Sequence, residues 1–266
     1  MSKNLQLTAK DVVAGYQDKE ILHGVSLQLP EHKISVILGS NGSGKSTMLK
    51  TFCRLLAPTA GEITLNDKSL TAISTKEIAR SIGLLPQTSI APEGIKVAEL
   101  VARGRYPHRK FMAPLNECDY AAIDEAMAAM KITDLADRSI DELSGGQRQR
   151  VFIALALAQQ TDILFLDEPT TYLDIAYQIE ILDLLKDLNK KRGTTIVMVL
   201  HDINLSTKYA DYLFAMKAGQ LIKEGTPAEL ITVDNIREIY GIESVVCPDP
   251  ISGTPLVVPV SSHDLS

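Results

Sequence analysis

The chain has 266 residues, a hydrophobic fraction of 45% and a formal net charge of −6. These values are typical of a globular protein with a sizeable core, built as one large domain or as one domain with a subdomain. The acidic balance argues against the general electrostatic attraction that basic proteins have for nucleic acid, so we expect no nucleic-acid partner. We also expect a protein that is neither secreted nor membrane-spanning. Residues 1–4 lead into no apolar signal core, no run of 18 apolar residues follows, and three scattered cysteines indicate reduced thiols.

The N-terminal part of the chain predicts antiparallel strands. Short alternating segments occupy residues 7–13 and 25–29, and a polar turn around residues 17–19 separates them. A further strand is expected at residues 62–65, before an Asn-Asp turn.

A glycine-rich loop separates the apolar run at residues 34–38 from helix-compatible sequence. It matches G-x-x-x-x-G-K-[ST] between a strand and a helix, the setting this motif requires. Its glycines allow successive N–H groups to turn inward around phosphate oxygens, at the positive end of a helix opened by Ser46. The alternative is a turn that binds nothing. The loop predicts a nucleoside triphosphate site, most simply for ATP, formed by Gly39, Ser40, Asn41, Gly42, Ser43, Gly44, Lys45, Ser46 and Thr47.

Within that loop, two side chains have predicted roles in phosphoryl transfer. Lys45 is expected to lie against the β- and γ-phosphates, and the Ser46 hydroxyl is expected to bind Mg²⁺.

The middle of the chain changes from strand to helix. Within residues 83–87, the sequence predicts a strand that Pro86 stops, with Gln87 directly after the proline. From about residue 91 to 160, alanine- and methionine-rich sequence predicts a helical subdomain inserted between strands of the main sheet. Ser144 is expected to begin the last helix of this segment.

Two carboxylates follow the apolar strand predicted at residues 163–166. Asp167 at the tip of this strand is placed to reach a Mg²⁺ ion, and Glu168 to point at an attacking water as a general base. An Asp-Glu pair at a strand end is also common as a purely structural feature. Its position downstream of the glycine-rich loop favours the functional interpretation.

The remainder predicts alternating helix and strand, and hence a mainly parallel sheet with nucleotide at the carboxyl ends of its strands. A helix carries apolar residues at 181, 184, 185 and 188 and ends at a basic turn and Gly193; a core strand follows at residues 195–200. We expect one ATPase domain over residues 1–226 and a C-terminal extension over 227–266, with short helices up to Tyr240 and a proline-rich end without an assignment.

A second phosphate-binding surface is predicted at Leu143-Ser144-Gly145-Gly146-Gln147, directly before a helix. Ser144 is a good N-cap and the glycines expose backbone N–H groups, although a simple capped turn would have the same sequence. Together with the glycine-rich loop, these five residues resemble the LSGGQ signature of nucleotide-binding subunits of ABC transporters. The resemblance implies the ABC ATPase fold, an α/β P-loop NTPase core with a mainly parallel sheet, an N-terminal antiparallel β subdomain and an inserted helical subdomain.

The resemblance assigns further residues one by one. Gln87 matches the Q-loop glutamine, which senses Mg²⁺ and the attacking water, and Asp174 matches the D-loop aspartate. His201 matches the switch histidine at the γ-phosphate, and Tyr16 matches the aromatic residue that stacks on adenine. Outside this family context, a strand-end histidine or a surface tyrosine is usually structural. Two departures remove no catalytic group: Ser40 replaces a usual proline, and Thr171-Tyr172 replace a serine and a small residue.

The same resemblance implies a mechanism and partners. Two copies would pack head to tail, so that Ser144 and Gly146 of one copy contact the γ-phosphate of ATP held by the other. Opening of this dimer after hydrolysis would act through the Gln87 region on transmembrane permease subunits. The chain would then lie at the cytoplasmic face of the membrane, with a substrate-binding protein on the other side.

Cargo is the least constrained prediction. Residues 104–108 and 167–176 resemble one branch of the family, the importers of ferric siderophore, haem and cobalamin, with ferric siderophore as the leading cargo. The basic stretch 103–110 is interpreted as a permease-facing surface, with an ordinary solvated loop as the alternative. Another class, a soluble ABC ATPase acting on ribosomes or DNA, stays open. A P-loop kinase does not account for LSGGQ or His201.

Overall fold

The computed structural model describes residues 5–17, 19–110 and 113–261. The leader at residues 1–4 and Asp18 of the predicted turn lie outside these described residues, as do residues 111–112 and the last five residues of the C-terminal extension. The chain divides into two compact units, one formed mainly by Thr71–Ile196 and the other by Gln6–Leu70 with the chain from Val197 onward. The chain passes between them at a 3₁₀ turn, η1 (Leu70–Ala72), and at strand β8 (Thr195–Val199).

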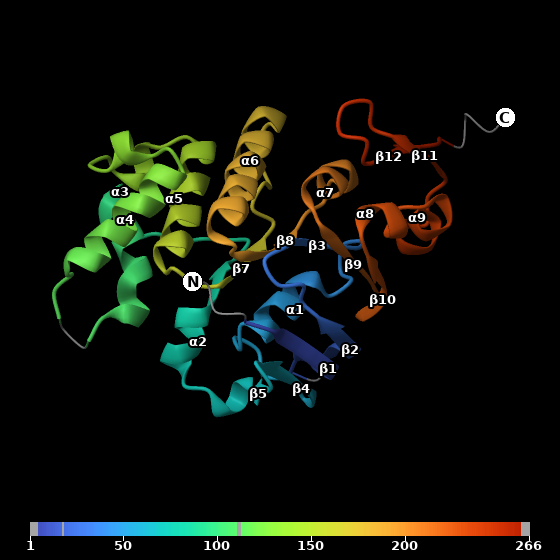
Figure 1. The fold of residues 1–266 in the computed structure, drawn as a ribbon, viewed down its shortest axis with the longest axis horizontal. Coiled ribbons are helices and arrows are strands. Elements are labelled where there is room, and N and C mark those ends of the chain that lie inside the picture. Colours follow the sequence, from blue (N-terminus) through green and yellow to red (C-terminus); the bar gives the residue numbers. More distant parts are fainter. Residues whose placement is uncertain (1–4, 18, 111–112, 262–266) are drawn as a thin grey trace. The chain divides into compact units, whose positions relative to one another are not determined.

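The first unit contains a parallel strand pair and most of the helices (Figure 1). Strands β6 and β7 pair in parallel, with Leu85 opposite Leu166. Between them in sequence lie helices α3, α4 and α5, which pack on one another and form the predicted helical insertion. The elements are α2 (Thr75–Ser81), β6 (Ile82–Leu85), α3 (Val97–Ala102), η2 (Arg103–His108), α4 (Glu117–Ala129), η3 (Thr133–Leu135), η4 (Ile140–Glu142), α5 (Gly145–Ala158), β7 (Ile163–Asp167) and α6 (Ile175–Arg192).

Helix α6 shows how local sequence sets an element's end. Its apolar residues at the predicted spacing are buried, and it stops at Gly193. This glycine has φ 67°, the left-handed conformation that closes many helices and that glycine adopts without steric cost. The prediction of this helix end is confirmed.

The second unit contains an antiparallel sheet and a core strand pair. Strands β1 and β2 pair antiparallel, as predicted, and extend to the order β2-β1-β4-β5. Strand β3 is buried along its whole length and pairs in parallel with β9, placing Val36 opposite Leu213, while β10 pairs antiparallel with β9. The elements are β1 (Leu7–Tyr16), β2 (Lys19–Gln28), β3 (Ile34–Leu38), α1 (Lys45–Phe52), β4 (Ala60–Leu65), β5 (Lys68–Ser69), α7 (Ile203–Tyr209), β9 (Tyr212–Lys217), β10 (Gln220–Gly225), α8 (Pro227–Leu230), α9 (Val233–Tyr240), β11 (Ser244–Pro248) and β12 (Pro255–Pro259).

The C-terminal extension contains a β-hairpin that the sequence pattern did not reveal. Strands β11 and β12 pair antiparallel, with Val246 opposite Val257. The Asn204 amide of α7 exchanges two hydrogen bonds with the backbone of Val257, at 2.8 and 3.1 Å, and so attaches the hairpin to α7. The extension is therefore packed against the helix that follows His201.

In the part of the chain that the structure describes, none of the helices has the length and apolar character needed to cross a bilayer.

Candidate nucleotide-binding and hydrolysis site

The glycine-rich loop adopts backbone conformations that explain its composition. Gly39, Gly42 and Gly44 have φ values of 148°, 80° and 101°, a region that side chains rarely allow. A Cβ atom on Gly39 would lie 2.3 Å from the Met216 carbonyl oxygen, so the loop passes too close to β9 for any other residue. Helix α1 begins at Lys45, one residue before the predicted start, and its N-cap Gly44 provides no side-chain hydrogen bond. The glycine-rich loop therefore leads directly into the N-terminus of α1, a position that favours an anion.

Lys45 lies at the centre of this loop. Its side chain is buried, and its Nζ donates hydrogen bonds to the carbonyl oxygens of Gly39, at 2.8 Å, and Ser40, at 2.9 Å. A buried ammonium at the centre of a glycine-rich loop is placed to pair with a phosphate group. The buried hydroxyl of Ser43, in the same loop, has no hydrogen-bond partner among the residues that the structure describes.

Tyr16 lies at the end of β1 and is 44% exposed. The Lys50 ammonium, on the same helix as Lys45, is 5.7 Å from the centroid of its ring. One face of the ring thus contacts a cation, and the exposed remainder is a flat surface of the kind on which a base stacks. Lys50 was not among the predicted site residues, because a single lysine in a helix carries no sequence signal.

The Asp-Glu pair lies at the end of β7, and the parallel pairing explains its neighbours. Leu85 and Leu166 are opposite each other, so the residues two positions beyond them, Gln87 and Glu168, emerge side by side. Gln87 Nε2 donates to Glu168 Oε2 at 2.7 Å, and the Thr171 hydroxyl donates to the same oxygen at 3.1 Å. The structure therefore brings together two predicted site residues, and it adds Thr171, which sequence reasoning had treated only as a departure from the family pattern.

The backbone of this turn is strained at the proposed base. Glu168 has φ 54°, an uncommon value for a residue with a side chain, and such strain persists where the surrounding structure fixes it. The preceding Asp167 is buried at the tip of β7. The two carboxylates thus occupy different environments, one buried and one partly exposed with two hydrogen-bond donors.

The LSGGQ segment forms the N-terminal cap of α5. Ser144 Oγ accepts from the Gln147 N–H at 3.3 Å, and Gln147 Oε1 accepts from the Ser144 N–H at 3.1 Å, a reciprocal capping box. A Cβ on Gly146 would lie 2.9 Å from the Tyr177 ring of α6, so this glycine permits the close contact of the two helices.

The remaining predicted residues lie at helix starts. His201 is exposed and stands between β8 and α7, next to Asp202, whose side chain caps α7 by accepting from the Leu205 N–H at 2.9 Å. Asp174 is the N-cap residue of α6 and makes no capping hydrogen bond with its side chain. The glycine-rich loop, Tyr16 and His201 belong to the second unit, while Gln87, Asp167, Glu168, the LSGGQ segment and Asp174 belong to the first.

A cavity of about 620 Å³ opens between α2 and η2. Its lining combines apolar surface with cationic side chains, and Tyr106 in this lining is 76% exposed. The residues are Thr75, Lys76 and Ala79 of α2, with Tyr106, Pro107, Arg109 and Lys110.

The comparisons with known proteins agree with this geometry. The ABC transporter family model matches residues 22–171. The probable siderophore transport system ATP-binding protein YusV of Bacillus subtilis (strain 168) is 46% identical over 95% of this chain and 92% of its own length. The ferric enterobactin transport ATP-binding protein FepC of Escherichia coli (strain K12) is 44% identical over 96% of this chain and 94% of its own length. The chain belongs to the ABC transporter family and is an ATPase of this class.

A solved structure confirms the predicted fold class. The bacterial ABC transporter cassette MJ0796, solved as a dimer, is 30% identical and superposes with a TM-score of 0.73, covering 83% of this chain and 98% of its own. The same cassette is known in a dimeric post-hydrolysis state bound to ADP and Pi, with a TM-score of 0.71. The α/β core with parallel strand pairs, the N-terminal antiparallel sheet and the helical insertion are the features of this fold.

Proposed function

We propose that this chain is the ATP-hydrolysing subunit of an importer that takes up ferric siderophores. The observation that carries the hydrolytic part is the Glu168 carboxylate, held at the end of β7 by Gln87 and Thr171 in a chain that also contains a complete phosphate-binding loop. The cargo is supported by the names of relatives 44–46% identical over nearly the whole chain, which transport siderophores or ferric enterobactin.

We assign nucleotide binding to the glycine-rich loop and Tyr16. The loop residues 39–47 would hold the phosphates through backbone N–H groups, with Lys45 leaving its carbonyl partners to pair with the β- and γ-phosphates. Its buried ammonium, already held at the loop by the Gly39 and Ser40 carbonyls, fits such a ligand. The Tyr16 ring would stack on the adenine.

The residues assigned to Mg²⁺ offer the hard oxygen ligands that this ion prefers: the Ser46 hydroxyl, the Asp167 carboxylate and the amide oxygen of Gln87. Among the described residues no group of three or more acidic, histidine or cysteine side chains could hold a metal by itself. That composition suits Mg²⁺, which is usually shared with substrate phosphates. When bound, the ion neutralises phosphate charge.

Hydrolysis is assigned to four side chains. Glu168 would take a proton from the attacking water, and Gln87 and Thr171 orient its carboxylate through the hydrogen bonds described above. His201 would donate to the γ-phosphate as charge develops. A general base of this kind typically contributes 10²- to 10⁴-fold to the rate, which sets the loss expected for Glu168→Gln.

The second half of each site would come from another copy of the chain. Ser144, Gly145, Gly146 and Gln147 present a helix N-terminus, and Asp174 lies at the start of α6. A helix N-terminus favours an anion, so this surface fits the γ-phosphate of ATP bound to a partner copy. Glu168→Gln is therefore expected to accumulate an ATP-bound dimer, detectable as a doubled mass in size-exclusion chromatography. A variant that hydrolyses ATP at the parental rate would remove Glu168 from this role.

The permease is proposed to contact the cavity between α2 and η2. Its apolar lining and the exposed Tyr106 provide contact area, and Lys76, Arg109 and Lys110 provide positive charge on an otherwise acidic protein. The chain would thus be held at the cytoplasmic face of the membrane, opposite an extracytoplasmic substrate-binding protein.

Uptake of radioactive iron tests the whole proposal. Cells lacking this chain are given back either the parental sequence or Glu168→Gln, and iron is presented on several siderophores. We expect uptake of one siderophore to return only with the parental sequence. If iron uptake is unchanged throughout, ferric siderophore is the wrong cargo, and haem and cobalamin are tested in the same cells.

A further inference from the structure

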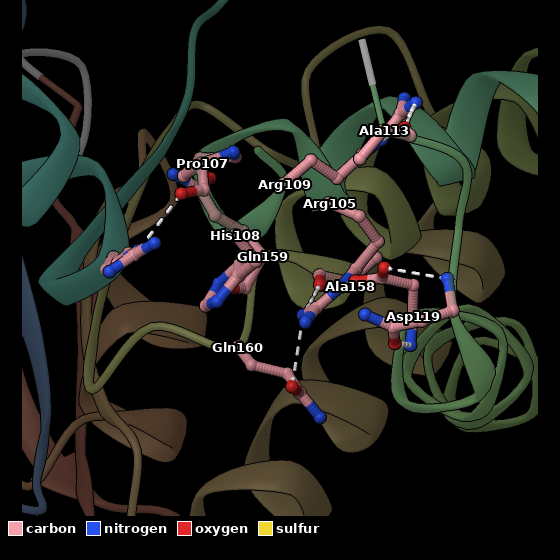
Figure 2. Close-up of polar contacts among 11 residues, drawn as sticks. Arg105, Pro107, His108, Arg109, Ala113, Asp119, Ala158, Gln159 and Gln160 are labelled. Atoms are coloured by element: carbon pink, nitrogen blue, oxygen red, sulfur yellow. Dashed lines mark hydrogen bonds and ion pairs between the residues drawn. The ribbon is translucent and has the colours of Figure 1, made fainter. Parts of the chain in front are cut away.

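The short segment η2 closes over the C-terminal end of helix α5. Gly104 lies so near this helix that a Cβ would come within 2.2 Å of the Leu155 carbonyl oxygen. The following residue, Arg105, turns its side chain into the interior and is only 4% exposed (Figure 2). A basic residue in a stretch expected to face solvent or a permease is therefore part of the core.

The Arg105 guanidinium binds three partners at once. Its Nη1 donates to the Ala158 carbonyl at 2.7 Å and to Gln160 Oε1 at 3.0 Å, and its Nε donates to Asp119 Oδ1 at 2.9 Å (Figure 2). Burial raises the pKa of Asp119, but hydrogen bonds from the Asn116 backbone and from Arg105 outweigh it and hold this pKa below its usual value. Asp119 is thus an ionised partner, and a cation sits at the negative end of the α5 dipole.

His108 makes a second contact with the same helix end. Its Nε2 donates to the Gln159 carbonyl at 2.7 Å, next to the carbonyl that Arg105 binds. The last carbonyls of a helix lack partners within it, so Arg105 and His108 together form a side-chain cap for α5. On the other side, η2 is bound by α2, because Arg80 Nε donates to the Pro107 carbonyl at 2.9 Å.

The opposite end of α5 is the LSGGQ segment. The helix runs without interruption from Gly145 to Ala158, about 21 Å at 1.5 Å per residue, and Ser144 is its N-cap. A continuous helix moves as a rigid element, so its C-terminal contacts help to set where Ser144 and Gly146 lie. The segment that holds this end is also the one that lines the cavity with Tyr106 and Pro107.

We propose that Arg105 is a positioning residue for ATP hydrolysis: it fixes the C-terminal end of α5 and thereby places Ser144 and Gly146 against the nucleotide of a second copy. This inference rests on the proposed role of the LSGGQ segment in the dimer. The planar guanidinium group of arginine has five N–H donors in fixed directions, so it can fix the position of the groups it binds. A buried ion pair as such adds little stability over apolar residues of similar size. The role of Arg105 is accordingly geometric.

The test uses the purified full-length chain and three variants. Arg105→Lys keeps the charge, but one ammonium cannot reproduce the three directed bonds. Arg105→Met combined with Asp119→Leu removes both buried charges together. His108→Gln, at a partly exposed position, is the mild variant. The matched control is Arg192→Gln, which breaks the Arg192–Glu125 ion pair between α6 and α4 and leaves α5 untouched.

Four readouts separate positioning from folding. Thermal unfolding measures stability, and equilibrium binding of radiolabelled ATP to the monomer measures the glycine-rich loop. ATP-driven dimerisation in the Glu168→Gln background measures the LSGGQ surface, and kcat in the parental background measures hydrolysis. For Arg105→Lys we expect a near-parental melting temperature and monomer ATP affinity, with dimerisation and kcat reduced about 10- to 100-fold, the cost typical of a displacement near 1 Å. His108→Gln should give a smaller loss in the same two quantities, and Arg192→Gln none.

Parental dimerisation and kcat in a folded Arg105→Lys protein would overturn the inference. The inference would also be overturned if dimerisation and kcat of Arg105→Lys fell only in proportion to its unfolded fraction. The same holds if Arg192→Gln lost as much dimerisation and kcat as Arg105→Lys. If the arginine variants do not fold, parental dimerisation by His108→Gln overturns it. Failure of the proposed function has a different signature, because then Glu168→Gln itself would hydrolyse ATP or fail to dimerise with ATP.

Discussion

Two helix N-termini in this molecule are both glycine-rich, yet they are built differently. Helix α1 begins after Gly44, without a side-chain cap, in a loop whose glycines hold positive φ angles and whose lysine is buried. Helix α5 begins after Ser144, where a reciprocal capping box satisfies the N–H groups of Ser144 and Gln147 with side chains. The first is therefore shaped for a phosphate before one arrives. The second is held in place by its own side chains, with the Gly145 and Gly146 N–H groups outside the capping box, and so suits a surface that engages only when a second copy presents ATP.

The largest expected effect is a difference in monomer ATP affinity between variants of the two helix N-termini. Lys45→Ala removes the buried ammonium, and we expect monomer ATP affinity to fall about 100-fold, near 3 kcal/mol. Ser144→Ala should leave the same affinity unchanged. Equilibrium dialysis with radiolabelled ATP measures both, and equal losses in the two variants would erase the distinction.

A second prediction concerns what holds the α1 loop. Burial raises the pKa of Tyr240 in α9 to about 12, although a hydrogen bond with the Gly39 backbone lowers it. The unfolded tyrosine loses its proton near pH 10, so its stabilising contribution is complete below pH 10 and is lost as the pH rises towards 12. Relative to Tyr240→Phe, the parental protein should lose about 2 to 3 kcal/mol of unfolding free energy over this window. Urea unfolding of both proteins at pH 8, 10 and 11.5 measures this difference. If the unfolding free energies of the two proteins change equally with pH, Tyr240 is exposed to solvent and not buried against the loop.

The smallest effect isolates the α5 cap. Ser144→Ala should cost about 1 kcal/mol of stability through loss of an N-cap, and it should also weaken ATP-driven dimerisation. Ser74 caps α2 in the same way, accepting from the Glu77 N–H at 3.2 Å, so Ser74→Ala is the matched control. We expect equal losses of melting temperature and a dimerisation defect only in Ser144→Ala. Equal dimerisation in both would reduce Ser144 to an ordinary cap.

Sequence patterns predicted the elements that depend on local chemistry. The buried strands β3 and β7, the glycine-rich loop and the end of α6 at Gly193 follow from apolar runs and from backbone angles that only glycine adopts freely. The contact between Gln87 and Glu168 follows only once the register of β6 and β7 is known.

The regions that sequence did not predict depend on tertiary contacts. Nothing in the 103–110 stretch distinguishes buried Arg105 from its basic neighbours, because a short 3₁₀ segment has no amphipathic period. The hairpin of β11 and β12 was hidden by prolines at its ends, Pro248 and Pro255, which normally argue against strands. Both features became visible only through their partners, Asp119 and Asn204.

The division of labour between the two helix N-termini is tested most directly by mixing two inactive variants. One carries Lys45→Ala and the other Ser144→Arg, which blocks the α5 surface. If each site joins the loop of one copy to the LSGGQ segment of another, mixed dimers contain one intact site. We predict that the mixture hydrolyses ATP well above the sum of its parts in a single-turnover assay. A mixture that stays at that sum would contradict the account, because each chain would then need its own loop and its own LSGGQ segment.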